Sequence, residues 1–203
     1  MKITSLKQQI KNPERVSIFV DEKYGFSLSL DELVRHKLAK GQELSEAELK
    51  KFKKISEDGK LRARSLEWLL NRPHSTREFR DYLYRKKADP ELSEQLIKEF
   101  TTRKYLDDTK FASWFIELRG RKNRSRRAIR AELLKKGISG EVLDEALAES
   151  EIDEEAALKE IIAKKLNQSR YRSDPLKLAK YLTSQGFSYD LVKKLLASNT
   201  PEN

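Results

Sequence analysis

From about residue 60 onward, apolar side chains recur every three or four positions, which predicts a succession of amphipathic helices. Three of these helices begin a repeated unit, and each carries an apolar trio at positions i, i+3 and i+4. Two further helices follow each of them, so we expect units of three helices. The trios are Leu66/Leu69/Leu70, Phe111/Trp114/Phe115 and Leu158/Ile161/Ile162.

The two later helices of each unit align when the chain is compared with itself, for example from Ser75 to Ser125 to Asp174. Such a register is typical of stacked repeats, in which each unit buries an apolar face against its neighbour. The N-cap columns are Ser75/Ser125/Asp174 and Asp89/Ser139/Ser188, and the helix-end column is Lys87/Gly137/Gly186. The core columns are Phe79/Ile129/Leu178, Leu83/Leu133/Leu182, Leu92/Val142/Leu191, Leu96/Ala146/Leu195 and Ile97/Leu147/Leu196.

The amino-terminal part has strand-like patterns instead. Residues 16–20 and 24–28 are predicted strands of a hairpin that turns at residues 21–23, and residues 3–6 are a candidate third strand. A helix is expected over residues 31–39, ended by Gly41, and another after the capping box of Ser45 and Glu48. We expect Asp58-Gly59 to join this part to the repeats.

These patterns predict a mainly α protein with tandem three-helix repeats in an elongated, curved arrangement, behind a small N-terminal β-hairpin-plus-helix module. The predicted parts are residues 1–58 for the β/α module, and residues 59–106, 107–152 and 153–203 for the three repeats.

Charge turns this scaffold into a candidate binding protein. The net charge is +10 and the isoelectric point about 9.6, which favours an anionic partner such as nucleic acid, a membrane surface or an acidic protein. The absence of cysteine excludes disulfides and thiolate metal sites. No apolar run reaches about 18 residues and the start has no apolar signal core, so we expect a cytoplasmic protein without membrane association.

Positive charge is densest between residues 119 and 136, where Glu132 is the one acidic residue. Arginine forks suit phosphates and carboxylates, although a solvated helix face and pairing with the acidic stretch at residues 149–155 remain alternatives. Arg170, Tyr171 and Arg172 form a second candidate contact. The basic patch consists of Arg119, Arg121, Lys122, Arg124, Arg126, Arg127, Arg130, Lys135 and Lys136.

Catalytic signals are weak. His36 and His74 have no neighbours at metal-ligand spacing, and Asp107 and Asp108 suit a helix N-terminus better than a pair of catalytic carboxylates. Trp68, Trp114 and Phe115 have core spacing, which favours packing over base stacking. We therefore expect no enzyme, no catalytic residues, no metal and no cofactor.

Two adjacent motifs resemble signatures of the RecX family. Lys104-Tyr105-Leu106-Asp107-Asp108 followed by Phe111-Ala112 is similar to its YLDD-x-x-FA motif, and Ile129, Glu132-Leu133 and Lys136-Gly137-Ile138 to its I-x-x-EL-x-x-KGI motif. Ser125 departs from the family, whose members often have glycine there. The motif residues expected to be structural are Tyr105, Leu106, Asp107, Asp108, Phe111, Ala112, Ile129, Leu133, Gly137 and Ile138.

The resemblance implies a non-enzymatic, monomeric regulator of the recombinase RecA in recombination, DNA repair and the SOS response. Such proteins bind in the groove of the RecA filament on single-stranded DNA, with at most weak direct DNA contact. ATP hydrolysis, coprotease activity and strand exchange then fall, and filament growth is limited. The alternative is a helix-turn-helix DNA-binding protein that acts without RecA. A nuclease is the least favoured reading.

Overall fold

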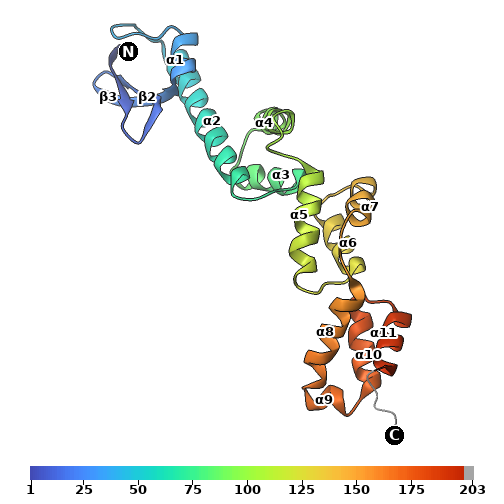
Figure 1. The fold of residues 1–203 in the computed structure, drawn as a ribbon. Helices are drawn as coiled ribbons and strands as arrows, with labels where there is room; N and C mark the ends of the chain where they lie inside the picture. The colour runs from blue at the N-terminus through green and yellow to red at the C-terminus, as the bar shows by residue number, and fades with distance from the viewer. Residues whose placement is uncertain (199–203) are drawn as a thin grey trace. The chain divides into compact units, whose positions relative to one another are not determined.

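The computed structural model describes residues 1–198 and divides into two compact units (Figure 1). Unit 1 holds Met1–Asn71 and Ala88–Leu96, and unit 2 holds Arg72–Lys87 and the chain from Ile97 onward. The described residues form three strands and eleven helices. The mainly α fold class with a small N-terminal sheet is confirmed. The predicted domain boundaries stay a prediction, and residues 199–203 of the third repeat lie outside the described part.

The sheet contains β1 (Ile3–Gln9), β2 (Asn12–Val20) and β3 (Lys23–Ser29), antiparallel and in the order β1-β2-β3. The hairpin turn forms because Asp21 and Glu22 adopt left-handed backbone angles, with φ of 46° and 66°. All three expected strands are present and are longer than predicted. The helix expected over residues 31–39 is shorter, since α1 spans Leu30–Arg35.

The core of unit 1 lies between the sheet and α2 (Glu46–Leu70), with α1 beside them. Ile18, Phe26 and Leu28 of the sheet are buried there, and the ring of Phe26 stacks on Phe52 at 5.4 Å. Helix α2 begins at the capping box predicted from Ser45 and Glu48, whose side chain and backbone atoms bond reciprocally.

The expected linker at Asp58-Gly59 is wrong, because α2 continues through it as one helix of 25 residues. A Cβ atom on Gly59 would lie 3.2 Å from Nη1 of Arg15 and 3.3 Å from Oε1 of Glu32. Arg15 in turn donates to the carbonyl oxygen of Ser27 at 2.8 Å. Glycine therefore serves here to let charged side chains of unit 1 approach the helix, not to interrupt it.

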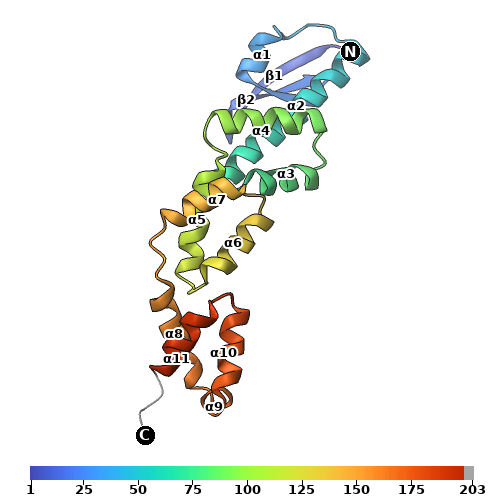
Figure 2. The ribbon, with the colours of Figure 1, turned by 90° about the vertical axis from the view of Figure 1, so that its right-hand side faces the viewer.

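Unit 2 consists of short helices, most of which begin at a capping side chain. Figure 2 shows α5, α6 and α7 as one group and α8 to α11 as the next. A four-residue helix, α9, was not predicted and lies within the third group. The helices are α3 (Thr76–Arg85), α4 (Pro90–Thr102, which starts in unit 1), α5 (Asp108–Gly120), α6 (Arg126–Lys135), α7 (Gly140–Ala148), α8 (Glu154–Leu166), α9 (Ser169–Arg172), α10 (Pro175–Ser184) and α11 (Tyr189–Ala197).

The repeat register seen in the sequence is present in the structure. The two core columns of the second helix in each repeat are fully buried. At the end of that helix, Lys87, Gly137 and Gly186 share positive φ angles of 56°, 82° and 93°. Each apolar trio has at least one buried member and one half-buried member, and Leu70 is 65% exposed. Trp68 and Trp114 are half-buried and Phe115 is buried, in line with packing roles. The core columns are Phe79/Ile129/Leu178 and Leu83/Leu133/Leu182.

Candidate functional site

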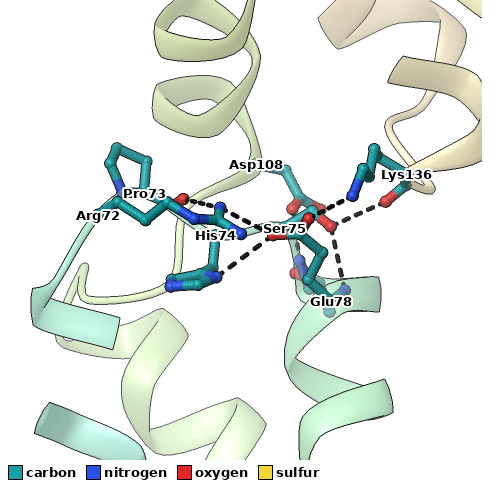
Figure 3. A network of polar contacts seen from close by, with 8 residues as sticks. Arg72, Pro73, His74, Ser75, Glu78, Asp108 and Lys136 are labelled. Carbon is teal, nitrogen blue, oxygen red and sulfur yellow. Dashed lines mark hydrogen bonds and ion pairs between the residues drawn. The ribbon is translucent and has the colours of Figure 1, made fainter. Parts of the chain in front are cut away.

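The three-helix repeats of unit 2 are joined by a polar junction, seen first where the start of α3 meets the end of α6 (Figure 3). The Ser75 hydroxyl accepts a bond from the Glu78 backbone N–H at 3.1 Å, which caps α3. The same hydroxyl donates its proton to the Lys136 carbonyl oxygen at 2.8 Å, at the C-terminal end of α6. One serine thus caps its own helix and binds the next repeat. We call this contact the α3–α6 junction.

A second junction, between α6 and α10, repeats this arrangement one unit further on. The Ser125 hydroxyl accepts from the Ala128 N–H at 3.2 Å and donates to the Gln185 carbonyl oxygen at 2.8 Å. Ser125 is fully buried. The serine that departs from the family pattern therefore keeps both the cap and the contact, and we call this contact the α6–α10 junction.

Carboxylates complete both junctions. Oδ1 of Asp108 accepts from the Thr76 N–H at 2.7 Å, and Oε1 of Glu154 accepts from the Arg126 N–H at 2.7 Å. Each acid stands at the start of the next repeat and satisfies the first amide of the preceding repeat's second helix. Asp107 accepts from two amides of α5, at 3.1 and 3.2 Å. Asp107 therefore caps α5, as predicted, whereas Asp108 binds an amide at the start of α3, which was not predicted.

Glycine at the end of α6 and α10 is required by close approach as well as by positive φ. A Cβ on Gly137 would lie 2.8 Å from Cβ of Arg77, and a Cβ on Gly186 would lie 2.5 Å from Oγ of Ser125. Lys87 has the same backbone conformation at the end of α3, where the described residues form no repeat junction of this kind. The helix-end column therefore holds glycine at both junctions and lysine where the junction is absent.

Of the two junctions, the α3–α6 junction also contains an ionic cluster around Glu78. The Glu78 carboxylate lies 2.6 Å from Nζ of Lys136, 3.0 Å from Nη1 of Arg72 and 3.3 Å from Nδ1 of His74 (Figure 3). Burial alone would raise the pKa of Glu78, but hydrogen bonds from Lys136 and Arg72 outweigh it and hold that pKa below its ordinary value. Glu78 is therefore charged at neutral pH and ties two repeats together.

Most cations of the predicted basic patch have partners inside the chain. Arg119 pairs with Glu132 at 2.7 Å and lies over the Phe115 ring at 4.8 Å. Arg126 donates to the Leu147 carbonyl oxygen and to Oγ of Ser150. The remaining partners are Glu117 for Arg121, Glu132 and Gln185 for Arg124, Asp144 for Arg130, and Glu78 for Lys136.

Three cations of the patch stay exposed and unpaired within residues 1–198: Lys122, Arg127 and Lys135. Lys122 precedes α6 in the loop, and Arg127 and Lys135 lie on α6 itself. The acidic stretch at residues 149–155 contributes Glu154 to the Arg126 backbone, so it does not neutralise these three. They are the part of the patch that remains available to an anionic partner.

The second candidate contact needs a correction. The Tyr171 side chain is 6% exposed and packs in the core of the last repeat, with its ring 5.5 Å from that of Tyr181. Tyr171 therefore does not offer a surface, because α9 turns it inward. Arg170, whose guanidinium lies 4.6 Å from the Tyr171 ring, and Arg172 are exposed.

The other sequence candidates are structural or distant from one another. His36 packs against Phe52 in unit 1 and His74 is buried beside Glu78 in unit 2. No group of three metal-ligating side chains occurs within the described residues. The motif residues Leu106, Phe111, Ala112, Ile129, Leu133 and Ile138 are buried, whereas Tyr105 is 41% exposed.

Sequence reasoning missed the junction residues Glu78, Glu154 and Gln185. The signal for Glu78 was present, since it stands three residues after Ser75, the capping-box position. Gln185 acts through its backbone carbonyl, which no side-chain pattern reveals.

No helix within residues 1–198 is long and apolar enough to cross a membrane.

Comparisons with known proteins agree with this architecture. The model of the regulatory protein RecX N-terminal domain matches residues 1–45, and that of the RecX second three-helix domain matches residues 107–147. Regulatory protein RecX of Listeria innocua is 32% identical over 207 residues, which cover 100% of this chain and 77% of that protein. The Bacillus licheniformis protein of that name is 32% identical over 99% of this chain and 78% of its own length.

Two solved structures are similar in fold. A crystal structure of regulatory protein RecX has a TM-score of 0.73 at 24% identity, covering 95% of this chain and 97% of its own. The crystal structure of RecX from Lactobacillus salivarius has a TM-score of 0.57 at 19% identity, covering 70% of this chain and 95% of its own.

A small sheet followed by helical repeats with repeated polar junctions defines a modular helical-repeat protein. Sequence identity of 32% to two regulatory proteins RecX, over at least 99% of this chain, places the protein in one family of that class. The chain belongs to the RecX family.

Proposed function

We propose that this protein is a negative modulator of the RecA recombinase that binds the RecA filament on single-stranded DNA. Binding would inhibit ATP hydrolysis, coprotease activity and strand exchange, and would limit filament growth in recombination and DNA repair. The observation that carries the proposal is the similarity, along the whole of this chain, to regulatory proteins of the RecX family. The resemblance to that family implied RecA as the target.

The repeats of unit 2 suit a repetitive partner. A filament offers the same surface many times, and linked contacts gain from a high effective concentration once the first has formed. Binding one state of the filament more tightly than another is then sufficient to shift assembly. The buried junctions support this because they hold successive repeats in a defined relation within unit 2.

Lys122, Arg127 and Lys135 are the side chains that we assign to the partner's negative charge, whether on DNA or on an acidic surface of RecA. Their neighbours in the basic patch are engaged within the chain. Replacing Arg126 or Arg130 would remove internal bonds to Leu147 or Asp144 and would mix folding with binding. The three exposed cations avoid this problem.

The test is the RecA ATPase on single-stranded DNA, titrated with this protein. We expect inhibition, and a triple change of Lys122, Arg127 and Lys135 to Ala should raise the half-inhibitory concentration about tenfold, at roughly 0.5 kcal/mol per exposed charge. A matched control changes Lys50, Lys51 and Lys53 of α2 to Ala, which removes the same charge from exposed positions of unit 1.

Absence of inhibition by the unaltered protein would refute the proposal. Equal weakening by the two triple variants would show a general charge effect and remove these three residues from it. Tight, sequence-selective DNA binding without RecA would favour the helix-turn-helix alternative.

A further inference from the structure

The sheet of unit 1 has a second face that the hydrophobic core does not use, although α2 covers part of it where Ser27, the partner of Ser17, is buried and donates its backbone N–H to Ser56. In an antiparallel sheet, directly paired residues point to the same side. Ser5 pairs with Phe19, Phe19 with Tyr24, and Lys7 with Ser17, so these side chains share one face. Their neighbours Ile18 and Phe26 point to the other face, into the core against α2. We call the face with Phe19 the outer face.

Two aromatic rings lie on this outer face. The rings of Phe19 and Tyr24 meet edge to face at 6.1 Å, Tyr24 is 52% exposed, and Phe19 is half-buried. Neither ring belongs to the core cluster of unit 1. A cross-strand aromatic pair stabilises a hairpin, but that role does not need the cations that surround the pair.

Lysines lie against both rings. The Lys7 ammonium is 5.1 Å from the centre of the Phe19 ring, and the Lys60 ammonium, from α2, is 6.0 Å from that of Tyr24. Asp21 and Glu22 stand in the hairpin turn, where Asp21 accepts the Lys2 N–H at 2.8 Å. Exposed lysine side chains can move from a ring onto a phosphate, which frees the ring for a base.

A hollow of about 530 Å³ adjoins Phe19. Its lining includes Lys7, Gln9, Lys11 and the side chain of Ile10, which is 98% exposed at the tip of the β1–β2 turn. The hollow is shallow and open, and its lining offers one aromatic face, one apolar tip, two amides and two cations.

We propose that the outer face of this sheet binds single-stranded DNA, with one base stacked on Phe19 beside Ile10 and with Lys7, Lys11 and Lys60 on the phosphates. The choice of DNA as the nucleic acid rests on the proposed function, which places the protein on a filament built on single-stranded DNA. The site is separate from the basic patch of unit 2 and gives the N-terminal module a role of its own. Stacking on an aromatic ring accepts any base, so the site is not sequence-selective.

The first experiment titrates a fluorescent oligo(dT) with the full chain, without RecA, and follows anisotropy. Phe19→Thr keeps a strand-forming side chain but removes the ring, and we expect affinity to fall about tenfold. Phe19→Tyr keeps the ring and should bind as the unaltered protein does. Lys7→Gln with Lys11→Gln should lower the slope of log affinity against log salt by about 1.4, at about 0.7 per lost phosphate contact.

The second experiment locates the contact directly. An oligonucleotide carrying 5-iododeoxyuridine is cross-linked by light to adjacent aromatic side chains, and peptide mass spectrometry identifies the site. We expect cross-links at Phe19 or Tyr24. Cross-links confined to unit 2, or affinity unchanged in Phe19→Thr, would overturn the inference, as would tighter binding of oligo(U) than of oligo(dT).

The unfolding midpoint of Phe19→Thr shows whether a loss of binding comes from a loss of fold. If Phe19→Thr is unfolded, the test uses Phe19→Tyr, for which the inference still requires a cross-link at residue 19. The outcome is also distinct from that for the proposed function. Failure of RecA inhibition with intact cross-linking at Phe19 removes the proposed function alone, and the reverse pattern removes this inference alone.

Discussion

The α3–α6 and α6–α10 junctions share a frame but differ in charge. In both, a buried serine donates to a helix-end carbonyl, an acid of the next repeat accepts an amide, and a glycine allows close approach. The α3–α6 junction adds the Glu78 cluster. At the equivalent place, the α6–α10 junction has Ala128, and Arg124 donates instead to the side-chain oxygen of Gln185 at 3.1 Å.

The comparison separates the features that both junctions share from the ionic cluster that only one of them has. Serine, acid and glycine recur at both places and therefore define the docking geometry. The ionic cluster occurs at one place, where the lowered pKa of Glu78 adds a contribution to stability that depends on pH. This division can be tested by removing the shared and the added parts separately.

The largest effect is expected from the shared glycines. Gly137→Ala or Gly186→Ala combines a left-handed backbone, which costs about 1–2 kcal/mol for a residue with a Cβ, with a steric clash across the junction. Each change should lower the unfolding free energy by about 2 kcal/mol or more. Urea unfolding measures the loss, and hydrogen exchange should place it at the altered junction.

Gly140→Ala is the matched control, because a Cβ at that position meets no atom within 4 Å and Gly140 has no positive φ. It lies in the first turn of α7 and should be neutral or slightly stabilising. Equal destabilisation by Gly140→Ala and Gly137→Ala would contradict the docking role of the glycine.

The shared serines come next. Ser75→Ala and Ser125→Ala each remove a helix cap and leave a carbonyl of the next repeat without its donor, which should cost about 1–2 kcal/mol. Ser139→Ala in the second capping column removes a cap alone and should cost less. If all three variants lose the same stability, the hydroxyl does not contribute to the docking of repeats.

Glu78→Gln tests the added part. Because its pKa in the folded protein lies below the ordinary value of 4.5, Glu78 contributes stability that is full above that value and is lost as the pH falls through the lower, folded pKa. At neutral pH the variant should lose about 1 kcal/mol. Its hydrogen exchange in α3 should then change less than that of the unaltered protein between pH 7 and pH 4.

An unchanged acid response of α3 in Glu78→Gln would show that another group governs it. Asp144→Asn is a suitable control, since its lowered pKa arises from an exposed pair with Arg130 away from the junctions. That variant should leave the acid response of α3 intact.

The smallest effect is a gain. Lys87 holds a φ of 56° without any junction contact that requires glycine, so Lys87→Gly should relieve backbone strain and stabilise α3 by about 0.5–1 kcal/mol. Thermal unfolding measures the shift. A loss of stability instead would mean that the Lys87 side chain makes a contact worth more than the strain.

Much of this architecture could be predicted because it follows from local rules. Core columns such as Phe79, Ile129 and Leu178 have helical spacing, and Ser75 and Ser125 have the side chain that an N-cap requires. The hairpin turn at Asp21 and Glu22 was also visible between two apolar runs. These features need no knowledge of distant contacts.

The features that could not be predicted depend on contacts between distant segments. Asp58-Gly59 has the composition of a linker, but it lies inside α2, where Arg15 and Glu32 approach Gly59 closely. Charge density marked residues 119–136 as one basic patch, although Glu132 within this stretch and Asp144 and Glu78 from other elements neutralise part of it. The pairing that divides engaged cations from available ones exists only in three dimensions.

The first N-cap column ends with an aspartate, and this has a consequence for how many repeats can be joined. Asp174 caps α10 by accepting the Lys177 N–H at 2.9 Å, but an ionised carboxylate has no proton to donate to a carbonyl. A further copy could therefore not dock on α10 as α10 docks on α6, and α3 ends at Lys87, without the glycine that docking elsewhere requires. Both outer members of the series thus lack one half of the connection that joins the repeats within unit 2.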